Sequence, residues 1–120
     1  MARRFEGKVV VVTGASSGVG RAIARAFGAE GARVALLART VEGLENAAAE
    51  IRAEGGQAMP LPTDVSDPEA VERAASAVEV AWGGIDFWVN DAMVSVFAPV
   101  AKMKDAEYRR VTEVNYLGTV

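Results

Sequence analysis

The sequence predicts an α/β protein built on a doubly wound parallel sheet with helices on both faces. Two observations support this fold class. Short apolar runs typical of buried strands alternate with segments whose apolar residues recur at helical spacing, and a glycine cluster separates the first strand from the first helix. Helices that join successive strands are right-handed crossovers, which makes the strands parallel. The length of 120 residues suits one domain, residues 1–120.

The first strand and the first helix flank the glycine cluster. Residues 9–13 read Val-Val-Val-Val-Thr, a β-branched run that predicts a strand buried on both faces. After the cluster, apolar side chains recur at helical spacing, arginines fall on the other side, and Gly31 ends the helix. The apolar positions are Val19, Ile23, Ala26 and Phe27.

Two further strands enclose the second helix. Residues 33–38 (Arg-Val-Ala-Leu-Leu-Ala) predict a buried strand, and Thr40 stands where an N-cap hydroxyl opens a helix. Gly55 and Gly56 end that helix, and residues 57–61 predict the third strand. The apolar side of the helix carries Leu44, Ala47, Ala48 and Ile51.

The rest of the chain predicts a third helix, a fourth strand and a final helix. Ser66 and Glu69 form a capping box at the start of the third helix, with Pro68 in its first turn. Residues 85–89 (Ile-Asp-Phe-Trp-Val) predict the fourth strand. The apolar positions of the third helix are Val71, Ala74, Ala75, Val78 and Trp82, and those of the final helix are Tyr108, Val111, Val114 and Leu117.

The end of the sequence predicts a truncated domain. Val120 lies inside a helical pattern without a capping or stop residue, and a sheet with four strands is small for this architecture. The far edge of the fourth strand, beside Trp88, is then expected to be uncovered. We therefore expect these residues to form the N-terminal part of a larger domain whose catalytic C-terminal part is absent, and to self-associate as a homo-oligomer.

Composition excludes several classes of function. The chain has no Cys and no His, which removes disulfides, thiolate nucleophiles, zinc sites and a Ser-His-Asp triad. Its 13 basic and 16 acidic residues give a net charge of −3, whereas nucleic-acid binding needs a clustered basic face. No apolar run approaches the roughly 20 residues of a membrane span, and no signal-peptide core is present. We expect a cytoplasmic protein without nucleic-acid or membrane partners.

The glycine cluster is the strongest functional signal. Residues 14–20 read Gly-Ala-Ser-Ser-Gly-Val-Gly where a strand meets a helix, the place where backbone N–H groups and the helix dipole favour a phosphate. Gly14 permits the tight turn, Gly18 lets a pyrophosphate approach the backbone, and Gly20 lets the helix pack on the sheet. Val19 stands where a P-loop needs its second glycine, which excludes a P-loop. A generic glycine-rich turn is the alternative.

This cluster and a later motif resemble the short-chain dehydrogenase/reductase family, which has a Rossmann-like fold. Thr13 to Gly20 matches the family loop Thr-Gly-x-x-x-Gly-x-Gly. Asp64 and Val65 match the family's Asp after the third strand, which recognises the adenine ring. The alternative for Asp64 is that it ends a strand and primes a turn.

Two more motifs follow in the family order. Residues 90–93 read Asn-Asp-Ala-Met where the family usually has Asn-Asn-Ala-Gly, so Asn90 and Ala92 match the cofactor motif while Asp91 and Met93 depart from it. Asn115 begins a match to the family's Asn-x-x-Gly helix, in which the Asn belongs to the catalytic tetrad.

The spacing of Asn115 is itself informative. It falls on the expected core-facing stripe of the final helix, where an unsatisfied amide costs about 1 to 3 kcal/mol, so we expect its amide to be paired. A bond to local backbone is the alternative.

The residues after the second strand favour NADP(H) over NAD(H). An acid at the end of this strand binds the ribose 2′-hydroxyl in NAD sites, but here the strand ends in Ala38, followed by Arg39. A guanidinium suits a 2′-phosphate, and the hydroxyls of Ser16, Ser17 and Thr40 are further candidate donors. The alternative is that Arg39 only ends a strand at the surface.

The resemblance implies an oxidoreductase whose complete form transfers hydride between NADP(H) and a small carbonyl or alcohol substrate. The family's catalytic base is a Tyr followed four residues later by Lys, but Tyr108 is followed by Thr112 and Tyr116 by Val120. We therefore expect the chain to be inactive alone. The alternatives are a non-catalytic nucleotide-binding module, and an interaction fragment that associates through its final helix or its uncovered sheet edge.

Overall fold

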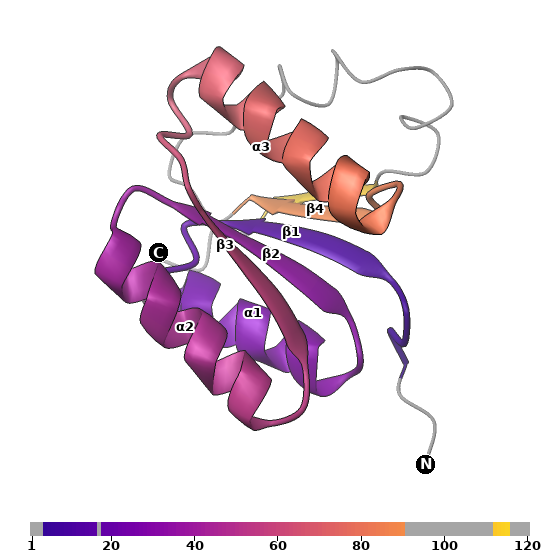
Figure 1. Cartoon of the computed structure of the whole chain (residues 1–120). Helices are drawn as coiled ribbons and strands as arrows, with labels where there is room; N and C mark the ends of the chain where they lie inside the picture. The colour runs from indigo at the N-terminus through magenta and orange to yellow at the C-terminus, as the bar shows by residue number, and fades with distance from the viewer. Residues whose placement is uncertain (1–3, 17, 91–111, 116–120) are drawn as a thin grey trace.

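The computed structural model describes residues 4–16, 18–90 and 112–115, which form a five-stranded sheet and three helices (Figure 1). The strands lie in the order β3-β2-β1-β4-β5, and every pair is parallel, which confirms the doubly wound parallel architecture. None of these described helices combines the length and the apolar character that a bilayer span requires. The elements are β1 (Val9–Thr13), α1 (Gly18–Ala29), β2 (Arg33–Ala38), α2 (Val41–Ala53), β3 (Gln57–Pro62), α3 (Pro68–Trp82), β4 (Phe87–Asn90) and β5 (Thr112–Asn115).

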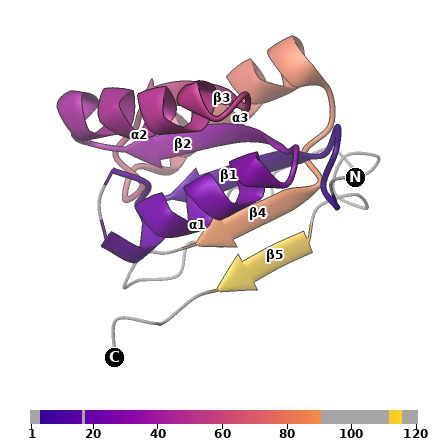
Figure 2. The ribbon, with the colours of Figure 1, turned by 90° about the horizontal axis from the view of Figure 1, so that it is seen from below.

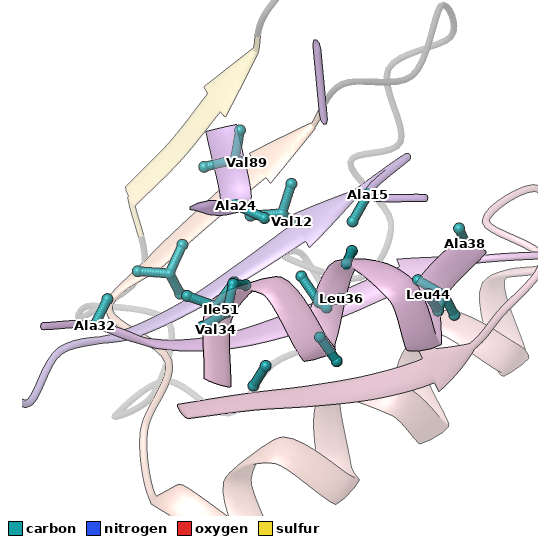
Figure 3. Close-up of a cluster of buried hydrophobic side chains, with 14 residues drawn as sticks. Val12, Ala15, Ala24, Ala32, Val34, Leu36, Ala38, Leu44, Ile51 and Val89 are labelled. Atoms are coloured by element: carbon teal, nitrogen blue, oxygen red, sulfur yellow. The ribbon is translucent and has the colours of Figure 1, made fainter. Parts of the chain in front are cut away.

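Helices α1 and α2 cover one face of the sheet, and α3 covers the other (Figure 1). All five residues of β1 are buried between these layers. Successive side chains of a strand point to opposite faces, so Val12 (Figure 3) and Val10 join the core under α1 and α2. Val9 and Val11 join the core under α3. A strand covered on both faces needs an unbroken apolar run, which is what the sequence supplies.

The sheet has its topological switch point beside β1. This strand pairs with β2 on one side and with β4 on the other, so that Val11 lies opposite both Ala35 and Trp88. The carboxyl ends of parallel strands meet at one edge, and the loops that follow β1, β2 and β3 begin there. In open α/β sheets, ligands bind in the crevice at such a switch point.

The segment of residues 112–115 differs from the predicted final helix. It forms strand β5, which pairs with β4 at the end of the sheet (Figure 2), with Val114 opposite Val89. The β-branched Thr112 and Val114 favour extended backbone, and the edge of β4 supplies a hydrogen-bonding ladder that outweighs the helical spacing. The edge expected to be uncovered is therefore paired, and the described sheet has a fifth strand. The other expected helical positions, Tyr108, Val111 and Leu117, lie outside the described residues.

Helix α3 has a different cap from the predicted one. Asp67 is the N-cap, and its side chain accepts a hydrogen bond from the backbone N–H of Glu69 at 3.1 Å. Ser66 donates to Asp64 instead, so the capping box of Ser66 with Glu69 is wrong. A carboxylate is the stronger acceptor, and the positive end of the helix dipole favours its charge. Thr40 is the N-cap of α2 as predicted, although its side chain makes no capping hydrogen bond.

Two ion pairs join α1 to α2. Arg21 Nε and Nη2 donate to the two carboxylate oxygens of Glu50 at 2.9 and 2.7 Å, and Arg25 Nη2 donates to Glu54 at 3.0 Å. The hydrogen bonds of the first pair raise the pKa of Arg21 and lower the pKa of Glu50. Because each arginine and each glutamate lies one helical turn from the next, the pairs form a ladder that aligns the two helices.

The outer edge of β3 offers few groups for another strand. The N–H of Thr63 donates to β2 at 2.7 Å, so the even-numbered residues of β3 direct their backbone groups away from β2. Two of these outward residues, Pro60 and Pro62, have no N–H to donate. The guanidinium of Arg52 donates to the outward carbonyl of Ala58 at 2.8 Å.

Candidate functional site

The glycine-rich turn leads from β1 into α1 at the carboxyl edge of the sheet. Gly14 has a φ of 67° and Gly18 a φ of 61°, a left-handed region that glycine adopts without strain. A Cβ built on Gly18 meets nothing within 4 Å, so the space above this residue is open. The first N–H groups of α1 have no acceptor within the helix and point out of this end. Ser17 lies outside the described residues.

The turn is anchored to the sheet by Ala15. Its N–H donates to the carbonyl of Leu37 in β2 at 3.3 Å, and its methyl group is fully buried in the core that also contains Leu44 (Figure 3). On the helical side, Val19 is half-buried and Gly20 is buried. The turn is thus held in place at both ends, while Gly18 is exposed between them.

Buried hydrogen bonds join β1 to β4 at the switch point. The Asn90 side-chain oxygen accepts a hydrogen bond from the Trp88 indole N–H at 3.2 Å. Thr13 Oγ1 lies 3.2 Å from the same oxygen and 3.4 Å from the carbonyl of Val89. Asn90 is 2% exposed and Trp88 is 1% exposed, so these polar groups depend on protein partners. Asn90 therefore links two strands at this edge, and its contact with a ligand stays a prediction. Ala92 lies outside the described residues.

Exposed polar residues follow β2. Ala38 ends the strand with 8% of its surface exposed, and Arg39 and Thr40 are both exposed. Helix α2 begins directly afterwards, so Arg39 and Thr40 lie between the end of β2 and the start of α2. A cation in this place is available to an anionic ligand at the edge of the sheet.

Asp64 follows β3 at the same edge. The N–H and hydroxyl of Ser66 donate to its Oδ1 at 3.0 and 2.6 Å. These hydrogen bonds, and then the positive charge of Arg39, hold the pKa of Asp64 below its ordinary value. Asp64 is consequently ionised at neutral pH and is coupled to Arg39 through their charges. The bonds to Ser66 also agree with the alternative in which Asp64 primes a turn. The neighbouring Val65 is half-buried against the core under α3.

Asn115 occupies a different kind of element from the one predicted. It is the last residue of β5 and pairs in register with Asn90 of β4, rather than lying on a helix. The ladder with β4 places its backbone at the carboxyl edge of the sheet, beside the switch point. Its assignment to a catalytic role stays a prediction.

The sequence of this chain is matched by a known family. The family model for short chain dehydrogenases matches residues 8–120, which is nearly the whole chain. The chain belongs to the short-chain dehydrogenase family. Strand β1, the glycine-rich turn and the start of β5 all lie within the matched region.

Curated members of the short-chain dehydrogenase family are similar over almost all of this chain. A short chain dehydrogenase of Pseudocercospora fijiensis is 41% identical over 114 residues, which cover 93% of this chain and 37% of that protein. The 3beta-hydroxysteroid dehydrogenase 1 of Eggerthella lenta is 41% identical over 115 residues, which cover 95% of this chain and 44% of that protein. The chain therefore spans less than half the length of these two relatives.

A solved structure from the short-chain dehydrogenase family has the same fold. It is a metagenomic short-chain oxidoreductase in complex with NADP, with 45% sequence identity and a TM-score of 0.72. The similarity covers 89% of this chain and 49% of the metagenomic protein.

One residue at this edge was missed by the sequence reasoning. Gly43 lies in the first turn of α2, and a Cβ built on it falls 2.8 Å from the Cβ of Ser16 in the glycine-rich turn. The available signal was a glycine inside a helix, where alanine is more favourable. Spacing along the chain gave no indication that this glycine faces the turn.

Proposed function

We propose that this chain binds NADP(H) as part of an oxidoreductase that transfers hydride between the nicotinamide and a small carbonyl or alcohol substrate. The supporting observation is the open, glycine-lined start of α1 at the switch point of the sheet. Membership in the short-chain dehydrogenase family supports the reaction class. When bound, the nicotinamide supplies the site that accepts or donates the hydride.

The pyrophosphate of the dinucleotide fits over residues 16–20. Its two negative charges match the outward N–H groups and the positive dipole end of α1. The absence of a side chain on Gly18 leaves room for the phosphates to reach the backbone, because nothing lies within 4 Å of its Cβ position. The hydroxyls of Ser16, Ser17 and Thr40 are the proposed additional donors.

The preference for NADP(H) over NAD(H) is assigned to Arg39. Its exposed guanidinium follows a strand that ends in Ala38 rather than in an acid. A carboxylate at that position would repel a 2′-phosphate, whereas Arg39 attracts it. The related metagenomic protein with NADP bound supports this choice. Asp64 and Val65 are proposed to contact the adenine, and Asn90 and Ala92 to line the nicotinamide side of the site.

Asn115 is the proposed catalytic-tetrad residue. Neither tyrosine of this chain has a lysine four residues later, so the proposed contribution of these 120 residues is dinucleotide binding. An amide exchanges no proton with substrate at neutral pH, so Asn115 would bind and orient rather than transfer the proton.

A titration of NADPH into the chain by isothermal calorimetry tests the proposal. We expect binding by the wild type and its loss in Gly18→Val, because the new side chain fills the space over the backbone. Valine is also strained at a φ of 61°, so Gly7→Val is the matched control. Gly7 has a φ of 77° and open space around it, but precedes the opposite end of β1. Equal NADPH affinity in Gly18→Val and the wild type would contradict the assigned site.

A further inference from the structure

The glycine-rich turn rests directly on the first turn of α2. A Cβ built on Gly43 falls 2.8 Å from Ser16 Cβ, 3.1 Å from the Ser16 carbonyl oxygen and 3.5 Å from Ser16 Cα. At such distances a side chain on residue 43 and the present position of Ser16 exclude each other. We infer that Gly43 is a positioning residue that seats the phosphate-binding turn on α2 and so fixes its distance from Arg39. This inference rests on the proposed dinucleotide site.

The turn cannot move away from α2 without loss of its own anchors. Ala15, the residue before Ser16, donates its N–H to Leu37 and buries its methyl group in the core with Leu44. A shift of Ser16 pulls on both of these contacts. Since the protein interior is close-packed, the displaced methyl group would leave one set of contacts and strain another.

Helix α2 is held more firmly against moving away than Ser16 is. Leu44, next to Gly43, is fully buried, and so are Ala47 and Ala48 further along the helix. The opposite end of α2 meets α1 closely, because a Cβ on Gly28 would lie 2.8 Å from Ile51 Cγ2. The ladder of ion pairs between α1 and α2 adds to this alignment. A methyl group on residue 43 therefore displaces Ser16, which is half-buried, rather than the helix that carries the fully buried Leu44.

The contact joins the two parts of the proposed site. The pyrophosphate is assigned to the turn above Ser16, and the 2′-phosphate to Arg39, which lies just before α2. A dinucleotide that spans both parts requires them at a fixed separation, and Gly43 sets that separation. Helix formation alone favours alanine over glycine at this position, so the benefit of glycine here lies in the close approach.

The variant Gly43→Ala tests the inference by calorimetric titration with NADPH and with NADH. We expect both affinities to fall by about tenfold or more, because the pyrophosphate is common to the two cofactors. The matched control is Asn46→Ala, an uncharged substitution at an exposed position of the same helix, for which both affinities stay at the wild-type level. Thermal unfolding of each variant by circular dichroism reports the stability of the fold.

Rescue separates the steric contact from a general loss of structure. Ser16→Gly removes the atom nearest to the new methyl group, although the carbonyl oxygen at 3.1 Å remains. In the Gly43→Ala background, Ser16→Gly should therefore recover part of the affinity, so that the double variant binds at least about threefold more tightly than the two single effects combined predict. A merely unstable fold would show no such coupling.

The outcomes distinguish this inference from the proposed function. If the wild type binds NADPH and Gly43→Ala binds it equally well, Gly43 does not position the turn and the proposed function stands. The same conclusion follows if Gly43→Ala loses affinity and Ser16→Gly recovers none of it. A wild type that binds neither dinucleotide would overturn the proposed function, and the inference with it.

Discussion

The buried bond between Trp88 and Asn90 makes the packing at the switch point testable without any ligand. In Asn90→Leu, the indole N–H of Trp88 loses its acceptor at a residue that is 1% exposed. A buried donor without a partner costs about 1 to 3 kcal/mol. The Thr13 hydroxyl contributes less, because the carbonyl of Val89 at 3.4 Å still accepts its proton. We expect the free energy of unfolding to fall by about 1 to 3 kcal/mol, which lowers the Tm of a small domain by about 4 °C or more.

A double-mutant cycle with Trp88→Phe isolates this contribution. Phenylalanine removes the N–H, so Asn90→Leu in the Trp88→Phe background should cost at least about 1 kcal/mol less than in the wild type. The packing defect left by the smaller ring is common to both arms and cancels. Urea unfolding followed by far-UV circular dichroism measures all four proteins. If the two substitutions were additive within about 0.5 kcal/mol, the bond would contribute nothing to stability and the expected cost of the unpaired indole would be refuted.

Three further predictions concern charges. Arg39→Ala should weaken NADP(H) by about 10- to 100-fold and leave NAD(H) nearly unchanged in calorimetric titrations; equal losses for both would overturn the 2′-phosphate assignment. The pKa of Asp64, followed by NMR of its carboxyl carbon, should rise more in Ser66→Ala than in Arg39→Ala, because the hydrogen bond from the Ser66 hydroxyl is the largest cause of its lowering. Ionised Asp64 therefore stabilises the folded state at a pH above its pKa in the unfolded chain, and this stabilisation is lost as the pH falls through its lower pKa in the folded state. A pKa of Asp64 at the ordinary value in the wild type would contradict this pH dependence. A double-mutant cycle of Arg21→Ala and Glu50→Ala should give a stabilising coupling energy, and this energy should decrease in high NaCl. A coupling energy that is insensitive to salt would argue against an ion pair.

Sequence reasoning located the elements whose burial is regular. The run at residues 9–13 coincides with β1, and residues 33–38 coincide with β2, because a strand covered on both faces is apolar throughout. The fourth strand begins at Phe87 rather than at residue 85, since Asp86 uses its N–H and its carboxylate to bind the backbone of Val9. A hydrogen bond between residues 77 positions apart produces no periodic pattern in the sequence, so the start of this strand could not be predicted from it.

The final segment shows where periodicity fails. Val114 fits helical spacing, but β-branched residues such as Thr112 and Val114 are also favoured in strands, and the outcome depends on which pairing partner is available. Here the partner is β4, and only the arrangement of the sheet reveals its open edge. The candidate site was likewise predicted only in part. The glycines and Arg39 were recognisable as sequence motifs, whereas the contact of Gly43 with Ser16 joins two segments that are distant in the sequence.

The closed edge of β3 bears on how the sheet reaches its native strand order. The segments that form β1, β2 and β3 precede β4 in the chain and make up one side of the sheet. This side of the sheet has two outer edges at which β4 could pair, one on β1 and one on β3. The outer edge of β3 lacks two N–H donors at Pro60 and Pro62, and Arg52 already occupies the carbonyl of Ala58. A strand added there gains few hydrogen bonds, whereas β1 offers a complete edge. The two prolines thus disfavour pairing of β4 with β3 and are consistent with the observed order, in which β1 lies between β2 and β4 and forms the switch point.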